Sequence, residues 1–141
     1  MSIAHILALF FTVALLVTTT YFLLGSAPLL ILKHDTPKDS RFVRGFFGVY
    51  YIGAITSASA AAVCYALAEK PALAAGAAGL AVAAIVARRK VTAKMDELGS
   101  QIQEGGLEVI PEFRRTHVYA ILFNLAQLVL IVWSLAVFSP R

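Results

Sequence analysis

The amino-acid sequence predicts an all-α integral membrane protein: a four-helix bundle whose third helix extends into the cytoplasm. Three observations predict this fold class. Hydrophobic residues make up 60% of the 141 residues and charged residues only 14%, whereas soluble domains average about 45–50% and about 25%. The apolar residues form four separate segments, and most basic residues lie in two of the connections between them. The length predicts a single domain, residues 1–141.

The four apolar segments predict membrane spans at about residues 3–25, 45–68, 72–88 and 117–138, since about 20 apolar residues cross the hydrocarbon layer. The first segment is interrupted by Gly25–Pro28, so we expect its helix to end near Leu24 with a kink or break after it. A cleaved signal peptide is the competing interpretation. It is disfavoured because no basic residue precedes the apolar run, which is also too long.

The connecting segments differ in length and character. Lys33–Arg44 predicts a polar loop, and Glu69–Pro71 predicts a tight turn with its proline in the first turn of the next helix. Arg88–Pro111 is the one long hydrophilic segment. Four apolar residues recur in it at helical spacing: Val91, Met95, Leu98 and Ile102. The third helix is therefore expected to continue beyond the membrane until Gly105–Gly106 ends it.

The basic residues predict an orientation. Four spans place both termini on one side and the two longer connections on the other. Ten of the twelve Lys and Arg residues lie in those connections, and the other two lie on the side of the termini. The ten are Lys33, Lys38, Arg41, Arg44, Arg88, Arg89, Lys90, Lys94, Arg114 and Arg115. Cytoplasmic segments carry such an excess, so we expect a bacterial inner-membrane protein with both termini outside.

The same rule accounts for the net charge of +4. The expected surroundings are therefore the lipid bilayer, and no nucleic-acid partner is expected. Small residues allow helices to approach closely in lipid, and the second and third spans are rich in them. They are Gly53, Ala54, Ser57, Ala58, Ala60 and Ala61, then Ala72, Ala75, Gly76, Gly79 and Ala83. These faces and the small size predict a homo-oligomer or a larger membrane complex.

The fourth span carries the candidate polar site. His117, Asn124 and Gln127 are separated by seven and three residues, which places them on one helix face. Polar side chains at membrane depth are costly and usually face the bundle interior. One interpretation is a polar pathway or small-molecule site with His117 at its mouth. The other, which is the commoner role of such residues, is that Asn124 and Gln127 hydrogen-bond to neighbouring helices.

The cysteine, charged and histidine residues of the chain exclude or disfavour several kinds of functional site. Cys64 is the only cysteine, so an internal disulfide and a cysteine-based zinc cluster are excluded. No Lys, Arg, Asp or Glu lies deep in a span, which disfavours proton-coupled transport. No motif predicts a catalytic residue, a metal site or a cofactor. Haem held by His34 and His117 is an alternative, disfavoured because His34 is expected in a loop.

Several short sequence features occur in a particular order. Ala27-Pro28 closes the first span, and Arg41–Tyr51 opens the second. Lys94-Met95-Asp96 follows the third, and Phe113–His117 with Asn124 opens the fourth. This order resembles the DUF4149 group of small bacterial membrane proteins, which is related to the eukaryotic transmembrane protein 205. The resemblance implies a four-helix membrane protein without an established activity. The link of the eukaryotic protein to drug resistance implies export.

The sequence therefore favours a non-enzymatic membrane protein that transports or exports a small molecule, or serves as an accessory subunit of a membrane complex. Two alternatives stay open. One is a membrane enzyme that acts on a lipophilic substrate at the cytoplasmic interface with His117 and Asn124. The other is a haem-binding membrane protein.

The orientation is testable with reporter fusions. A reporter that is active only in the cytoplasm should be active when inserted within residues 100–106 and inactive when fused after Arg141. A fusion after Arg141 that is active in the cytoplasm would contradict the predicted topology.

Overall fold

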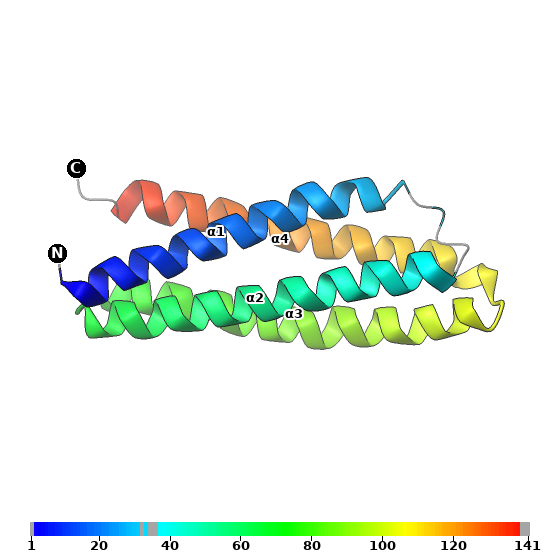
Figure 1. Cartoon of the computed structure of the whole chain (residues 1–141), viewed down its shortest axis with the longest axis horizontal. Coiled ribbons are helices and arrows are strands. Elements are labelled where there is room, and N and C mark those ends of the chain that lie inside the picture. Colours follow the sequence, from blue (N-terminus) through cyan, green and yellow to red (C-terminus); the bar gives the residue numbers. More distant parts are fainter. Residues whose placement is uncertain (1, 32, 34–36, 139–141) are drawn as a thin grey trace.

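The computed structural model describes residues 2–31, 33 and 37–138, and four long α-helices account for nearly all of them (Figure 1). These are α1 (Ile3–Leu29), α2 (Pro37–Leu67), α3 (Pro71–Gln103) and α4 (Ile110–Phe138), with a short 3₁₀ helix, η1 (Leu107–Val109), before α4. The described residues contain no strand. Each of the four helices is long and apolar enough to cross a membrane. The fold is therefore all-helical and consistent with a multi-pass membrane protein.

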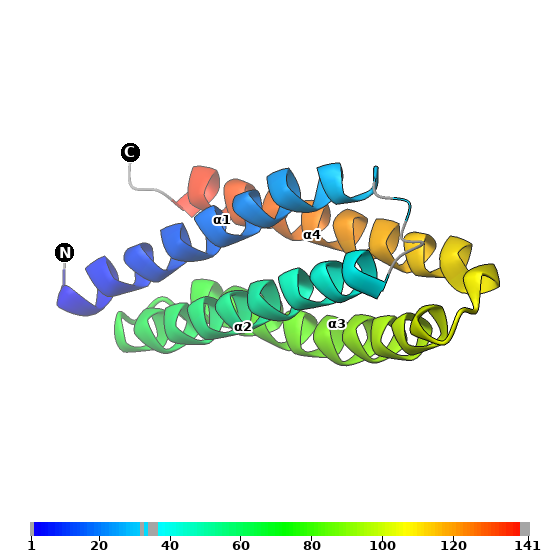
Figure 2. The ribbon, with the colours of Figure 1, turned by 45° about the vertical axis from the view of Figure 1, so that its right-hand side comes forward.

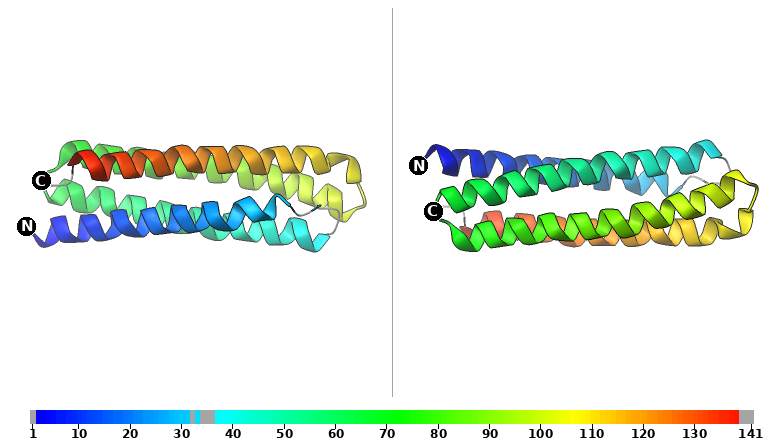
Figure 3. Two further views of the ribbon diagram at one scale, coloured as in Figure 1. Left: turned by 90° about the horizontal axis from the view of Figure 1, so that it is seen from above. Right: turned by 90° about the horizontal axis from the view of Figure 1, so that it is seen from below.

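The helices run up and down in chain order. The α1–α2 and α3–α4 connections lie at one end of the bundle, and the α2–α3 turn lies at the other end with both ends of the described chain (Figures 1 and 3). Each helix packs against its two neighbours in the ring α1–α2–α3–α4, so α2 and α4 are diagonal to each other. Packing is closest between α2 and its neighbours α1 and α3, and α4 is held more loosely.

The buried residues of α1 and α4 follow a seven-residue repeat with alternating steps of four and three. On α1 they are Ala8, Thr12, Leu15, Thr19, Phe22 and Ser26. On α4 they are Phe113, His117, Ala120, Asn124, Gln127 and Ile131. This 3.5-residue period keeps one face of each helix turned toward the bundle axis and is the pattern of left-handed helix packing.

Alanines form the contact between α2 and α3, the closest in the bundle. Ala54, Ala58 and Ala61 of α2 and Ala77, Ala81 and Ala84 of α3 are all buried. Part of the predicted α2 face is therefore correct. On α3, Gly76 and Gly79 instead point outward, as do Ala72 and Ala75. Small residues occur on every side of this alanine-rich helix, so composition does not identify its packing face.

The expected end of the first helix near Leu24 is wrong, because α1 continues through Gly25–Pro28 to Leu29. Pro28 lies in the last turn, so only one further residue of α1 follows the helical hydrogen bond that its missing N–H removes. A Cβ atom added to Gly25 would lie 2.6 Å from Cζ of Phe46. Gly25 therefore leaves space for the Phe46 ring to pack against α1, and it does not end the helix.

Two other boundaries also differ from the prediction. α2 begins at Pro37, so most of the expected polar loop Lys33–Arg44 is helical, and α4 begins at Ile110 rather than near 117. Hydropathy marks only the apolar part of a helix and misses the polar turns before it. The expected extension of α3 as a helix past Arg88 is confirmed. Of the four apolar residues at helical spacing in this extension, Met95, Leu98 and Ile102 are fully buried.

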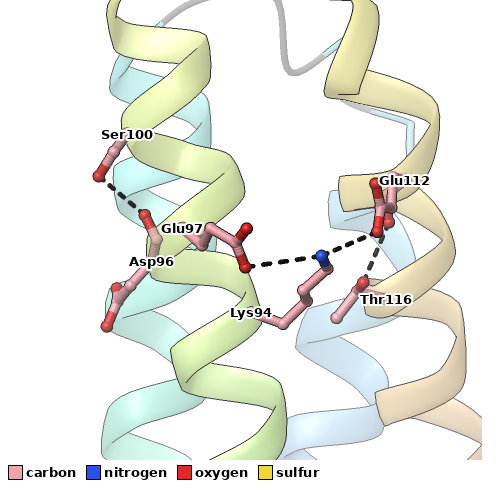
Figure 4. Close-up of polar contacts among 6 residues, drawn as sticks. All are labelled: Lys94, Asp96, Glu97, Ser100, Glu112 and Thr116. Atoms are coloured by element: carbon pink, nitrogen blue, oxygen red, sulfur yellow. Dashed lines mark hydrogen bonds and ion pairs between the residues drawn. The ribbon is translucent and has the colours of Figure 1, made fainter.

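Side chains of α3 hold the extended part against both neighbours. Nη1 of Arg44 on α2 lies 3.0 Å from Oδ1 of Asp96. Nζ of Lys94 lies 2.9 Å from Oε1 of Glu112 on α4 (Figure 4). A Cβ atom at Gly99 would lie 3.1 Å from Nε of Arg44, so this glycine makes room for the guanidinium group.

A third contact joins α4 to the end of α1. Nη2 of Arg114 donates a hydrogen bond of 2.8 Å to the carbonyl oxygen of Leu30. The last carbonyls of a helix lack partners within the helix, so the guanidinium group caps α1. With the two ion pairs, this bond links the four helices in the order α1–α4–α3–α2 at the end that carries the charged connections.

Candidate functional site

The predicted polar face of α4 lies inside the bundle. His117 and Asn124 are each 0% exposed, and Gln127 is 6% exposed. The seven-residue repeat of α4 places all three on the face that meets the other helices. The sequence spacing therefore correctly identified both the shared face and its direction.

Gln127 makes a direct link across the bundle. The hydroxyl of Tyr50 on α2 donates a hydrogen bond of 3.0 Å to Oε1 of Gln127, although α2 and α4 lie on a diagonal. The Thr19 side chain of α1 lies beside the same hydroxyl. Gln127 thus has the interhelical hydrogen-bonding role that the sequence left as one of two interpretations.

Asn124 has no such link. Among the described residues, neither its carboxamide nitrogen nor its oxygen has a hydrogen-bond partner, and the side chain is fully buried. A carboxamide offers two donors and an acceptor, and leaving a buried polar group unsatisfied costs about 1–3 kcal/mol. The structural interpretation therefore applies to Gln127, which joins two helices. Asn124 instead presents unused hydrogen-bonding groups to the interior.

His117 lies inside the bundle and not at a surface opening, which differs from its predicted place at the mouth of a pathway. Its ring meets that of Phe47 edge to face, with centroids 5.0 Å apart and an interplanar angle of 81°. His34, the second residue of the haem interpretation, lies outside the described residues. The structure therefore does not place the two histidines relative to each other.

Sequence reasoning missed the polar residues of α1. Thr12, Thr19 and Ser26 are buried at intervals of seven residues, and that spacing within the first span was the available signal. The hydroxyls of Thr12 and Tyr65 on α2 lie 3.0 Å apart, and Thr12 also donates to the carbonyl of Ala8 at 2.8 Å. Hydroxyl groups are easily overlooked because a helix backbone accepts their hydrogen bonds.

Two large apolar cavities lie around this polar interior. One, of about 810 Å³, lies between α1 and α2 and includes Tyr50 in its wall. The other, of about 500 Å³, is lined by residues of all four helices, among them Thr12 of α1 and Trp133 of α4. Neither is lined by His117 or Asn124. Tyr50 is thus the residue that connects the larger cavity with the polar face of α4.

Within the described part of the chain, no three His, Cys, Asp or Glu side chains gather closely enough to hold a metal ion. Cys64 is a free, half-buried thiol. Searches against protein-family models, curated proteins and solved structures gave no match for this chain. The resemblance to the DUF4149 group therefore stays a prediction. The fold and site together define an all-helical protein, consistent with a multi-pass membrane protein, that has a buried and uncharged polar interior.

Replacing Asn124 tests its unusual environment. Asn124→Leu keeps the number and branching of the side-chain heavy atoms and removes two unsatisfied polar atoms, so it should stabilise the purified protein by about 1–3 kcal/mol. Thermal unfolding in detergent, followed by circular dichroism, measures the change. Leu125→Ala, at the neighbouring exposed position, is the control and should change stability little. A destabilised Asn124→Leu variant would show that the carboxamide has a partner.

Proposed function

We propose that this chain is a non-enzymatic membrane protein that binds a small molecule inside the bundle and allows it to pass through the membrane. The observation that supports this proposal is the fully buried Asn124 carboxamide, whose donors and acceptor have no partner among the described residues. A protein that keeps such a group in a membrane interior bears its cost. A ligand that hydrogen-bonds to the group offsets that cost when it is bound.

The buried polar side chains of the spans indicate the kind of ligand. They are amides, hydroxyls and one imidazole, and they include Asn124, Gln127, Thr19, Ser26 and His117. Such groups match the donors and acceptors of an uncharged molecule. A buried ion would instead require an opposite charge close by. The proposed ligand is therefore a neutral, amphipathic small molecule, and its passage follows its concentration gradient.

Asn124 is fully buried among the described residues, so entry of a ligand to it requires a helix to move. α4 is the natural candidate because it packs more loosely than the other helices and carries three of the polar side chains. Displacing α4 breaks the Tyr50–Gln127 hydrogen bond, which has a modest strength of about 0.6–1.7 kcal/mol in membrane bundles. Opening of α4 is thus compatible with the forces that hold it.

We also propose a location and an orientation. The protein belongs to a bacterial inner membrane with both termini outside and the long end of α3 in the cytoplasm. Ten of the twelve basic residues lie within residues 33–44 and 88–115, the parts of the chain that include the α1–α2 and α3–α4 connections, and this excess supports a cytoplasmic placement of that end. Both ends of the described chain lie at the opposite end of the bundle (Figure 1).

A homo-oligomer is proposed through α3, since Gly76 and Gly79 face outward and an added Cβ atom at either would meet nothing within 4 Å. Small outward-facing residues permit close contact between helices of neighbouring copies. Light scattering in mild detergent should give a multiple of 15.1 kDa for the protein component, reduced to one chain in a Gly76→Leu/Gly79→Leu variant. A monomeric unmodified chain would contradict this proposal.

Proteoliposomes test the transport proposal. Vesicles that contain the full chain should release chloramphenicol, a neutral amphipathic amide, faster than protein-free vesicles. Asn124→Leu should return the rate to that of protein-free vesicles while its circular dichroism spectrum stays unchanged, and Leu125→Ala should keep the faster rate. Equal rates for the unmodified chain and Asn124→Leu would overturn the role of Asn124, and equal rates with and without protein would overturn passage of this ligand class.

A further inference from the structure

The cavity between α1 and α2 is a long groove at the end of the bundle that carries the charged connections. The two helices diverge toward that end (Figures 1 and 2), and the groove has a volume of about 810 Å³. Along α2 its wall extends from Lys38 to Gly53, a distance of 15 residue-to-residue steps. At about 1.5 Å per residue the wall is about 22 Å long.

This length matches one leaflet of a bilayer. Half of the hydrocarbon layer is about 15 Å thick, so the groove covers that depth and reaches into the headgroup region. Its polar end, at Lys38 and Arg41, precedes the apolar segment that begins near Gly45. The position along α2 therefore places these two cations near the headgroups and the rest of the groove beside the acyl chains.

The walls of the groove are apolar and largely aromatic. The Phe46 ring stacks on Phe22, with centroids 5.5 Å apart and an interplanar angle of 16°, and lies beside Tyr21 on the outer side. At Gly45 an added Cβ atom would meet nothing within 4 Å, so the groove is open there. A surface of this kind accepts a hydrocarbon chain without requiring any hydrogen bond from it.

The two cations at the groove end differ in their contacts from three other basic residues at the same end of the bundle. Arg44, Lys94 and Arg114 each contact an acceptor of a neighbouring helix. Lys38 is exposed, as is Arg41, and neither forms an ion pair or hydrogen bond with a described residue. The charges that hold the bundle together are thus paired, and those at the groove are available to an anion.

We propose that this groove binds an anionic phospholipid of the adjacent leaflet, with its phosphate between Lys38 and Arg41 and one acyl chain along Phe46. Charge complementarity and the length of the groove support this occupant. A helix from a second copy is a poorer match, because an apolar helix surface would bring no acceptor to the two cations. The inference concerns the outer groove and stands independently of the interior site at Asn124.

Lipid binding to the full chain in detergent tests the headgroup contact. The protein should bind dioleoylphosphatidylglycerol more tightly than dioleoylphosphatidylcholine in a native mass spectrometry titration. Lys38→Gln/Arg41→Gln should weaken binding of the anionic lipid by about thirtyfold, since each basic residue contributes roughly a factor of five near anionic headgroups. The control Arg88→Gln/Arg89→Gln removes the same charge elsewhere and should retain the affinity. An equal loss in both variants, or equal affinity for the two lipids, would overturn the proposal.

A second variant tests the acyl-chain contact with all charges present. Gly45→Trp fills the groove and should weaken binding of the anionic lipid. Gly48→Trp is the matched control, because an added Cβ atom there also meets nothing within 4 Å and the residue lies outside the groove wall. Unchanged affinity in Gly45→Trp would contradict the proposal. So would a change in oligomeric mass without a change in lipid affinity, which would indicate a second copy in the groove.

Discussion

The hydrogen bond from Tyr50 to Gln127 joins α2 and α4, which lie diagonally across the bundle and do not pack against each other. In lipid, hydrophobicity does not favour one rotation of a helix over another, so interhelical polar contacts and packing must do so. α4 is the most loosely packed helix, and this bond sets which of its faces turns inward. Because Asn124 and His117 follow the same seven-residue repeat as Gln127, the rotation that makes this bond also buries both of them.

The sequence predicts features that depend on one helix alone. The four helices, the continuation of α3 past Arg88 and the shared polar face of α4 all follow from periodicity and composition. Features that depend on two helices were not predictable. Composition did not identify the α3 packing face, because alanine and glycine occur on all sides of that helix. The partner of Gln127 and the orphaned Asn124 depend on where Tyr50 lies, which no spacing within α4 encodes.

The two ends of the bundle are stabilised by different forces. At the end of the charged connections, Arg44–Asp96, Lys94–Glu112 and the Arg114 cap join the helices, and the α1–α2 divergence leaves an apolar groove. Toward the other end, alanines bring α2 and α3 together. Tyr50 lies between these regions, with its ring in the groove wall and its hydroxyl on the polar interior. A shift of the Tyr50 ring in the groove wall would therefore also move the hydroxyl that bonds to Gln127.

A direct interaction between Tyr50 and Gln127 orients α4 in this bundle. A double-mutant cycle of Tyr50→Phe and Gln127→Leu, measured as free energies of unfolding in mixed detergent micelles, isolates their coupling from their separate packing effects. We expect a favourable coupling of about 0.6–1.7 kcal/mol, as for other interhelical hydrogen bonds in membranes. Strictly additive effects of the two substitutions, with no coupling, would contradict it.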